Sequence, residues 1–240
     1  MKYFLLFLTL ALTSQLKAQD PPKKVRTDFM PVAIGGNITL YYRYKNKCEK
    51  LEAFESAMGT PIFYSGPQLL ELYKTEKDLE ASATANPTIT PLLSIQLPEN
   101  SQRTLLLFTS SADQKISAKA FAIDATNFAA GDYRVYNLSS LNAIGVIGKK
   151  KFNITPGKTI DVSQPDLREK DRDLGVQLGY VDEEKKEHLT YSSVWGHSSL
   201  ARQYIFLLNS GNPQDPVQAR KFHDVPSVPS RGYEPEKKAP

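Results

Sequence analysis

The segment Tyr191-Ser-Ser-Val-Trp-Gly-His197 has the composition best suited to chemistry, because it holds two serines, the only tryptophan and one of three histidines. A serine beside a histidine suggests a nucleophile with its general base. The Gly-x-Ser-x-Gly turn that presents such a serine in many hydrolases does not occur in the chain. We therefore interpret the segment as a loop at a sheet edge, in which Trp195 covers the end of the core. A hydrolase of unfamiliar type that uses Ser192 to His197 is an alternative.

Metal ligands and cofactor motifs give no comparable pattern. His188, His197 and His223 fall in a predicted hairpin, a loop and a tail, and no pair has the spacing of a zinc-binding helix. Carboxylates are frequent at 166–173 and 182–187, but lysines and arginines alternate with them, which is typical of a solvated surface. We expect no metal, no cofactor and no catalytic residue.

One local concentration of positive charge, Lys149, Lys150 and Lys151, follows Gly148 at a predicted chain reversal. A hairpin tip of this kind can present its lysines to an anionic glycan, a lipid headgroup or a protein. Lysines at a hairpin end also prevent sheet edges from pairing with other chains. The candidate partner contacts are Lys149, Lys150, Lys151, Trp195 and His197.

Aromatic residues make up 10% of the chain, including 12 tyrosines and 11 phenylalanines. In the predicted strand 37–44, Tyr41 and Arg43 share the face opposite the most apolar one. An exposed tyrosine there would suit a carbohydrate or a protein, because its ring offers flat apolar area with a polar end. A carbohydrate-binding module is therefore a further alternative.

The first residues indicate export. Lys2 precedes the apolar run from Tyr3 to Leu12, and Ala18 ends a short polar stretch, so residues 1–18 form a predicted secretory signal peptide. The apolar run is shorter than the roughly 20 residues of a membrane-spanning helix. We expect a periplasmic or secreted protein without stable membrane insertion after cleavage.

The charge and the cysteine content exclude two further classes. Removal of Lys2 and Lys17 lowers the formal net charge from +4 to +2, which is too small to predict a nucleic-acid partner. Cys48 is the only cysteine, so no internal disulfide staples the fold. We expect a buried or half-buried inert thiol, with pairing to another chain as the alternative.

Short alternating segments with polar turns dominate the chain and predict an all-β fold, an antiparallel β-sandwich with little helix. Residues 35–224 form the predicted sandwich, either as one unit or as two packed β subdomains with a boundary near 110–127. Residues 19–34 have the prolines and lysines of a linker, and residues 225–240 form a predicted disordered, proline-rich tail. Residues 201–208 are the last strong strand, and a single helical turn is expected at 76–81.

Residues 128–162 show the clearest turn chemistry and are expected to form a meander of short strands. Pro156-Gly157 suits a type II turn, because its second central position requires positive φ. Gly131-Asp-Tyr133-Arg-Val135 resembles the tyrosine corner of immunoglobulin-like domains, in which a tyrosine hydroxyl bonds to upstream backbone. Residues 87–97, 104–108 and 116–123 are expected to be consecutive antiparallel strands.

The order of several short motifs resembles a group of exported β-sandwich proteins of Gram-negative bacteria such as Verrucomicrobia. The motifs are Tyr64-Ser-Gly66-Pro67, Leu72-Tyr73, Ala130-Gly-Asp-Tyr133, Asn137-Leu-Ser139, Gly148-Lys-Lys150, Pro156-Gly157, Arg202 and Ile205-Phe-Leu207. The resemblance covers most of the chain after the signal peptide, and it implies the fold and export without an assigned activity. We expect a non-enzymatic protein that binds or assembles with another envelope or extracellular component, a protein or a glycan.

Overall fold

A computed structural model describes residues 23–83, 89–111, 113–124, 128–164 and 172–225. These residues form sixteen β-strands and one short α-helix, so the predicted all-β, sandwich-like fold is confirmed. The predicted signal peptide and residues 226–240 of the predicted tail lie outside the described residues. No helix in the described part of the chain has the length and apolar character to cross a membrane.

The first half of the chain contributes eight strands and the helix. They are β1 (Lys24–Ile34), β2 (Ile38–Tyr44), β3 (Lys47–Ala53), β4 (Ile62–Pro67), β5 (Leu69–Leu72), α1 (Glu76–Ala81), β6 (Leu93–Gln96), β7 (Arg103–Ser110) and β8 (Ile116–Ala122). The helical turn expected at 76–81 is confirmed as α1. Thr75 caps it, accepting a hydrogen bond from the Asp78 amide, while the Asp78 carboxylate accepts one from the Thr75 amide.

The second half contributes the other eight strands. They are β9 (Tyr133–Asn137), β10 (Asn142–Ile147), β11 (Lys150–Ile154), β12 (Thr159–Val162), β13 (Arg172–Val181), β14 (Glu187–His197), β15 (Arg202–Asn209) and β16 (Val217–Asp224). The turn expected between β11 and β12 is present, with Gly157 at φ 74°.

The two halves repeat one topology. In the first half, the sheet order is β4-β1-β7-β8, with β1 and β7 parallel; in the second it is β12-β9-β15-β16, with β9 and β15 parallel. In the first half, the strand pairs β2–β3 and β5–β6 meet through a bridge between Tyr41 and Tyr73. In the second half, the equivalent pairs β10–β11 and β13–β14 join into the sheet β11-β10-β13-β14. Each strand of the first half therefore has its counterpart eight strands later.

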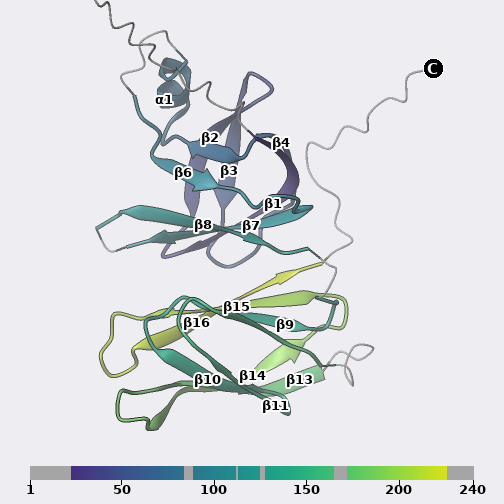
Figure 1. The fold of residues 1–240 in the computed structure, drawn as a ribbon, viewed down its shortest axis with the longest axis vertical. Coiled ribbons are helices and arrows are strands. Elements are labelled where there is room, and N and C mark those ends of the chain that lie inside the picture. The colour runs from purple at the N-terminus through teal and green to yellow at the C-terminus, as the bar shows by residue number, and fades with distance from the viewer. Residues whose placement is uncertain (1–22, 84–88, 112, 125–127, 165–171, 226–240) are drawn as a thin grey trace, which may run out of the picture.

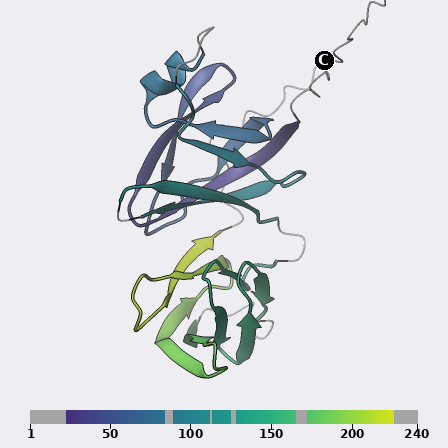
Figure 2. The ribbon, with the colours of Figure 1, turned by 60° about the vertical axis from the view of Figure 1, so that its left-hand side comes forward.

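The halves lie one above the other and form four layers of sheet (Figures 1 and 2). The sheets β4-β1-β7-β8 and β12-β9-β15-β16 face each other across a central apolar cluster, in which the rings of Tyr136 and Phe206 stack at 5.0 Å. Met30 and Val32 point into this cluster from β1. The two inner sheets are thus covered on both faces, and the two outer sheets have one face toward solvent.

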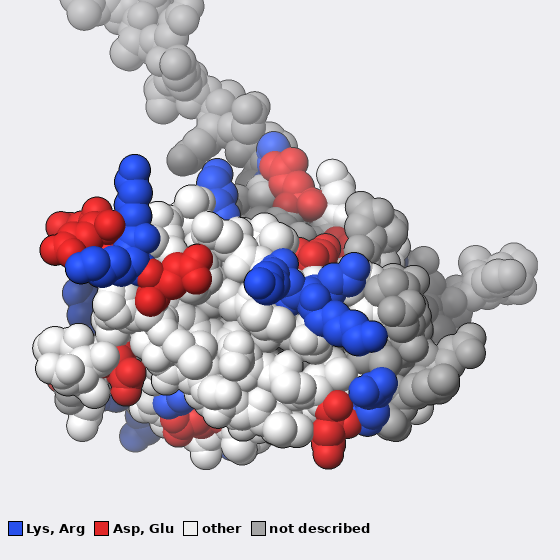
Figure 3. Space-filling model, turned by 90° about the horizontal axis from the view of Figure 1, so that it is seen from below, with Lys and Arg blue, Asp and Glu red and all other residues white. Residues whose placement is uncertain are grey.

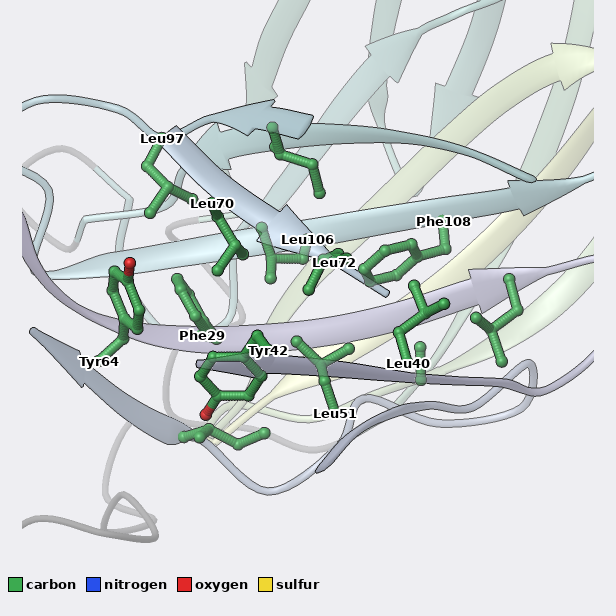
Figure 4. Packing of buried hydrophobic residues seen from close by; sticks show 14 of the residues in the cluster. Phe29, Leu40, Tyr42, Leu51, Tyr64, Leu70, Leu72, Leu97, Leu106 and Phe108 are labelled. Carbon is green, nitrogen blue, oxygen red and sulfur yellow. The ribbon is translucent and has the colours of Figure 1, made fainter. Parts of the chain in front are cut away.

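Each half also has its own core. In the first half, Phe29 of β1 stacks on Tyr64 of β4 at 4.7 Å, and Leu40, Leu51 and Leu72 pack around them from the outer strands (Figure 4). Burial of this many large apolar side chains is the main stabilising contribution in a fold without a disulfide.

The interpretation of residues 19–34 as a linker is wrong for Lys24–Ile34, which form β1 at the centre of an inner sheet. A strand buried on both faces shows a continuous apolar run instead of alternation, and this hid β1 in the sequence. β1 pairs with β4 only as far as Phe29, so Pro31 has no partner residue in β4. Its missing amide therefore leaves no β4 carbonyl without a hydrogen-bond donor.

Two further expectations about strand pairing are wrong. The predicted meander does not form, because β9 pairs with β12 and β15 while β10 pairs with β11 and β13. The strand at 93–96 pairs with β5 in an outer sheet and does not pair with β7. A further strand, β16, follows the segment predicted as the last strong strand and lies within the predicted bounds of the sandwich. In both halves the chain alternates between two layers, which local patterns do not reveal.

An ion cluster joins the two halves at the edge of the central cluster. The Nη1 atom of Arg103 in β7 lies 2.7 Å from Oδ2 of Asp224 in β16, and Nη1 of Arg202 in β15 lies 3.8 Å from the same oxygen. The Asp224 side chain is 1% exposed, so one carboxylate serves a buried pair of guanidinium groups from different halves.

Candidate functional site

All five candidate contact residues lie in or directly beside one outer sheet, β11-β10-β13-β14. Lys150 and Lys151 begin β11, and Lys149 precedes them in the turn from β10; all three are exposed. Trp195 and His197 lie in β14 at the opposite edge of the same sheet. The interpretation of 191–197 as a loop is therefore wrong, because these residues belong to β14.

Trp195 and His197 turn inward, so neither ring is presented to a surface partner as predicted. Trp195 is 9% exposed, its Nε1 donates to the Tyr191 hydroxyl at 2.7 Å, and the Lys221 ammonium lies 5.0 Å from its ring centre. His197 is 4% exposed, with Nδ1 at 3.0 Å from the Tyr133 hydroxyl. Both residues help to close the core of the second half.

The bond between Tyr133 and His197 also corrects the tyrosine-corner prediction. The Tyr133 hydroxyl bonds to a histidine 64 positions downstream rather than to upstream backbone. Burial raises the pKa of Tyr133 to about 12, so the hydroxyl stays protonated at neutral pH. Tyr133 has a structural role that links the sheet of β9 to the sheet of β14.

Ser192 lies on the other face of β14. Successive side chains of a strand point to opposite faces, so an odd separation places Ser192 outward while His197 points into the core. The nucleophile–base pair proposed for a hydrolase is therefore not formed by these two residues. The described residues contain no group of three His, Cys, Asp or Glu side chains placed to hold a metal ion.

The outward face of this sheet contains a depression of about 650 Å³. Ile144 and Val146 of β10 form its floor together with Gln177 and Gly179 of β13. Gly179 has no side chain, and a β-carbon at this position would lie 2.1 Å from the His188 carbonyl oxygen. Gly179 therefore lets the β14 backbone approach β13 closely beside the register shift at Leu178 and Gly179.

The rim of the depression carries charges of opposite sign at its two sides. Lys151 and Asn153 line it from β11, and Glu187 and Leu189 line it from β14. Of the predicted contact residues, Lys151 lines this depression. Figure 3 looks onto this face and shows uncharged side chains across its middle, with charged groups around them.

Apolar side chains on β14 are unusually exposed. On the outward face, Leu189 is 62% exposed and Val194 65%. Together with Ile144 and Val146, they make this face less polar than a surface that only contacts water requires. None of these residues was among the predicted contacts, although Ile144 and Val146 share one face of a predicted strand.

The equivalent sheet of the first half is closed differently. There, α1 connects β5 to β6 and contacts β2 and β3, with Leu79 buried and its carbonyl accepting a hydrogen bond from Arg43 at 2.8 Å. Tyr41 is half-buried and bridged to Tyr73 through backbone hydrogen bonds. The Tyr41 and Arg43 face, considered for carbohydrate binding, is thus partly covered.

In the second half, the equivalent connection between β13 and β14 is a short turn from Asp182 to Lys186. Among the described residues of this half, no helix covers the outer face, and the depression is open. The comparison of the two halves therefore singles out the face of β11-β10-β13-β14 as the candidate site.

Cys48 lies outside this site, in β3, and is half-buried, as expected. Burial and the nearby Glu76 carboxylate raise the pKa of its thiol above the ordinary range. The thiol therefore stays protonated and unreactive at neutral pH.

No protein-family model and no curated protein matches this chain.

Proposed function

We propose that the protein is an exported, non-enzymatic β-sandwich that binds or assembles with another component of the cell envelope or the extracellular space. The predicted signal peptide and the resemblance to exported proteins of Gram-negative bacteria support a periplasmic or secreted location. The contact surface is the outer face of β11-β10-β13-β14.

The open depression is the observation that carries the proposal. Its floor is aliphatic, from Ile144 and Val146, and the Asn153 and Gln177 amides offer both donors and acceptors beside it. Lys151 and Glu187 provide opposite charges at the two sides. An apolar centre with a polar rim is the usual anatomy of a protein–protein contact.

A protein partner fits this lining better than a carbohydrate. Sugar rings are bound largely by stacking on exposed aromatic side chains. Phe152 is the aromatic residue among the described residues that line the depression, and it is 6% exposed, with its ring turned inward against Gly145. The lining thus favours a polypeptide segment that inserts an aliphatic side chain.

A binding role also fits the placement of the reactive side chains. Ser192 and His197 lie on opposite faces of β14, and the hydroxyl bonded to His197 is that of Tyr133. The segment from Ser192 to His197, the alternative site for hydrolysis, therefore packs against the core on one face and belongs to the proposed contact surface on the other.

Affinity capture from native envelope extract tests the proposal, using wild type, Ile144→Lys and the matched control Thr39→Lys. Thr39 is an exposed β2 residue on the equivalent sheet of the first half, opposite Glu52, so its lysine variant adds the same charge away from the depression. A residue at the centre of a contact typically contributes 2 kcal/mol or more, so Ile144→Lys should reduce recovery of the partner at least roughly tenfold.

Wild type and Thr39→Lys should recover the same partner in equal amount. Equal recovery by Ile144→Lys would overturn the assignment to this face. Repeated recovery of no partner by wild type would overturn the binding function itself.

A further inference from the structure

We infer that the open edge of β14 pairs with β14 of a second copy of this chain and joins two outer sheets into one continuous sheet. This inference concerns self-association through a strand edge, and it goes beyond the partner proposed for the sheet face. Backbone groups of β14 point outward, the strand is almost free of charge, and its apolar side chains are exposed.

The unpaired backbone groups of β14 can be assigned from the ladder. Among the described strands, β14 lies at a sheet edge and pairs with β13 alone. The Gly148 amide donates to the Gly175 carbonyl at 2.9 Å, so the odd-numbered residues from 175 to 179 direct their backbone groups toward β10, away from β14. Val176 and Leu178 therefore bond to β14, opposite Ser193 and Tyr191.

It follows that Ser192, Val194 and Gly196 direct their amide and carbonyl groups away from the sheet. The Gly196 carbonyl has a cover, because the Lys221 ammonium lies 3.5 Å from its oxygen. The stretch from Leu189 to Val194 is left open and can accept another strand. Such an edge is a template for strand pairing.

The charge pattern distinguishes β14 from the other edge strands. Between Glu187 and the end of the strand at His197 it has no lysine, arginine, aspartate, glutamate or proline. The other described edges are charged, interrupted or short: β3, β8, β11 and β16 carry lysines, β4 ends at Pro67, and β6 and β12 have four residues each. Charge, proline and short length are the usual means of preventing pairing.

Pairing also shields the exposed apolar side chains of the strand. Leu189 and Val194 are 62% and 65% exposed and lie on either side of the open stretch. In a sheet, a residue contacts the side chains directly across and diagonal to it on the neighbouring strand. A second β14 would supply such neighbours, with the same uncharged composition.

The ends of β14 favour an antiparallel arrangement of two copies. Glu187 begins the strand, and Lys221 lies beside its other end, over the Trp195 ring. Antiparallel pairing centred on Ser192, whose backbone groups point outward, brings Glu187 of each copy toward Lys221 of the other. A parallel arrangement would place like charges beside each other.

The resulting dimer has a two-fold axis and one self-complementary contact, the commonest form of soluble oligomer. The axis is perpendicular to the sheet, so both depressions open on the same side of an eight-stranded outer sheet. Two identical sites on one surface would bind a repetitive or dimeric partner more tightly than one site does.

Light scattering of the full chain during size-exclusion chromatography tests the inference, with a second measurement by sedimentation equilibrium. Wild type should have twice the chain mass. Val194→Pro should be monomeric, because it removes an amide that points outward while leaving the β13 ladder intact. Val194→Lys keeps the amide and places a charge at the edge, and it should also be monomeric.

Ile144→Lys is the matched control, because residue 144 lies on the same face but in β10, two strands from the edge. It should stay dimeric while losing the captured partner, so the two proposals fail separately. Circular dichroism checks that each variant is folded, and Val194→Lys keeps the test valid if the proline variant is not.

A monomeric wild type at every concentration reached would overturn the inference, and so would a dimer that persists in both folded Val194 variants. Open-ended oligomers larger than a dimer would overturn the two-fold arrangement. A monomeric wild type whose captured partner is lost on Val194→Pro would assign the β14 edge to that partner instead of a second copy.

Discussion

The buried ion cluster between the two halves gives a quantitative test of how they are held together. Asp224→Asn removes the carboxylate charge and leaves the guanidinium groups of Arg103 and Arg202 facing each other at an interface where their side chains are 13% and 7% exposed. Removing one partner of a buried ion pair typically costs about 3–5 kcal/mol, because a charge is left buried without compensation. The free energy of unfolding should fall by this amount.

Urea unfolding followed by circular dichroism measures the effect. At an m-value of about 2–3 kcal/mol per molar, the midpoint should fall by about 1–2 M. Glu99→Gln is the control, since it removes an exposed carboxylate that lies 2.7 Å from the Lys23 ammonium and should leave the midpoint unchanged. The double variant Arg103→Met with Asp224→Asn should lose less than the sum of the single variants, because the pair is coupled.

The refuting result is equally definite. If Asp224→Asn and Glu99→Gln shift the midpoint equally little, the cluster does not hold the halves together as described. A single unfolding transition that separates into two in Asp224→Asn would support the role of the cluster in coupling the two sandwiches.

Two further perturbations test the packing. Gly145→Ala should lower stability by about 1–3 kcal/mol, because its β-carbon would lie 2.5 Å from the Phe152 ring, while Gly175→Ala, with nothing within 4 Å, should be tolerated in the same urea titration. Stability should also fall as pH rises from 10 to 12, by about 1.4 kcal/mol per pH unit for each buried tyrosine that titrates, since the folded state retains protons that the unfolded state has released. Burial raises the pKa of three tyrosines to about 12, namely Tyr64, Tyr133 and Tyr136. The absorbance of their tyrosinate forms should therefore appear together with loss of structure. Its appearance in a fully folded protein would contradict the burial of these side chains.

The sequence predicted the strands that have one face toward solvent, because alternation is visible there. Residues 38–44 are an example: Ile38, Leu40 and Tyr42 are buried, while Thr39 and Arg43 are exposed. The helical turn of α1 was also visible, since Thr75 and Asp78 have the spacing of an N-terminal cap.

The strands covered on both faces were harder to predict. Phe29 and Met30 are adjacent in β1 and point into two different cores, so the chain shows no period there. β16 was missed for another reason: Pro213 and Pro216 precede it, and its partly exposed Arg220 and Lys221 give it the composition of a tail.

The order of the strands in the sheets could not be predicted from local sequence patterns. The parallel pairs β1–β7 and β9–β15 join residues that are more than 60 positions apart, and neither half resembles the other in its turn motifs. The repeat of one topology became visible only from the strand order.

The candidate site was predicted in part. Lys151 was chosen for its charge and lies at the rim of the depression, whereas Trp195 and His197 were chosen for their chemistry and are buried. The depression lies on an outer sheet face formed by four strands, and the local sequence does not reveal how these strands are ordered.

Photo-cross-linking in native cells tests the central claim most directly, with a photoreactive amino acid placed at Val146 in the depression and, as control, at Thr39 on the equivalent sheet. The account predicts one cross-linked adduct of defined mass from position 146 and none from position 39. An adduct from position 39 with none from position 146 would contradict the assignment of the contact surface to the outer face of β11-β10-β13-β14.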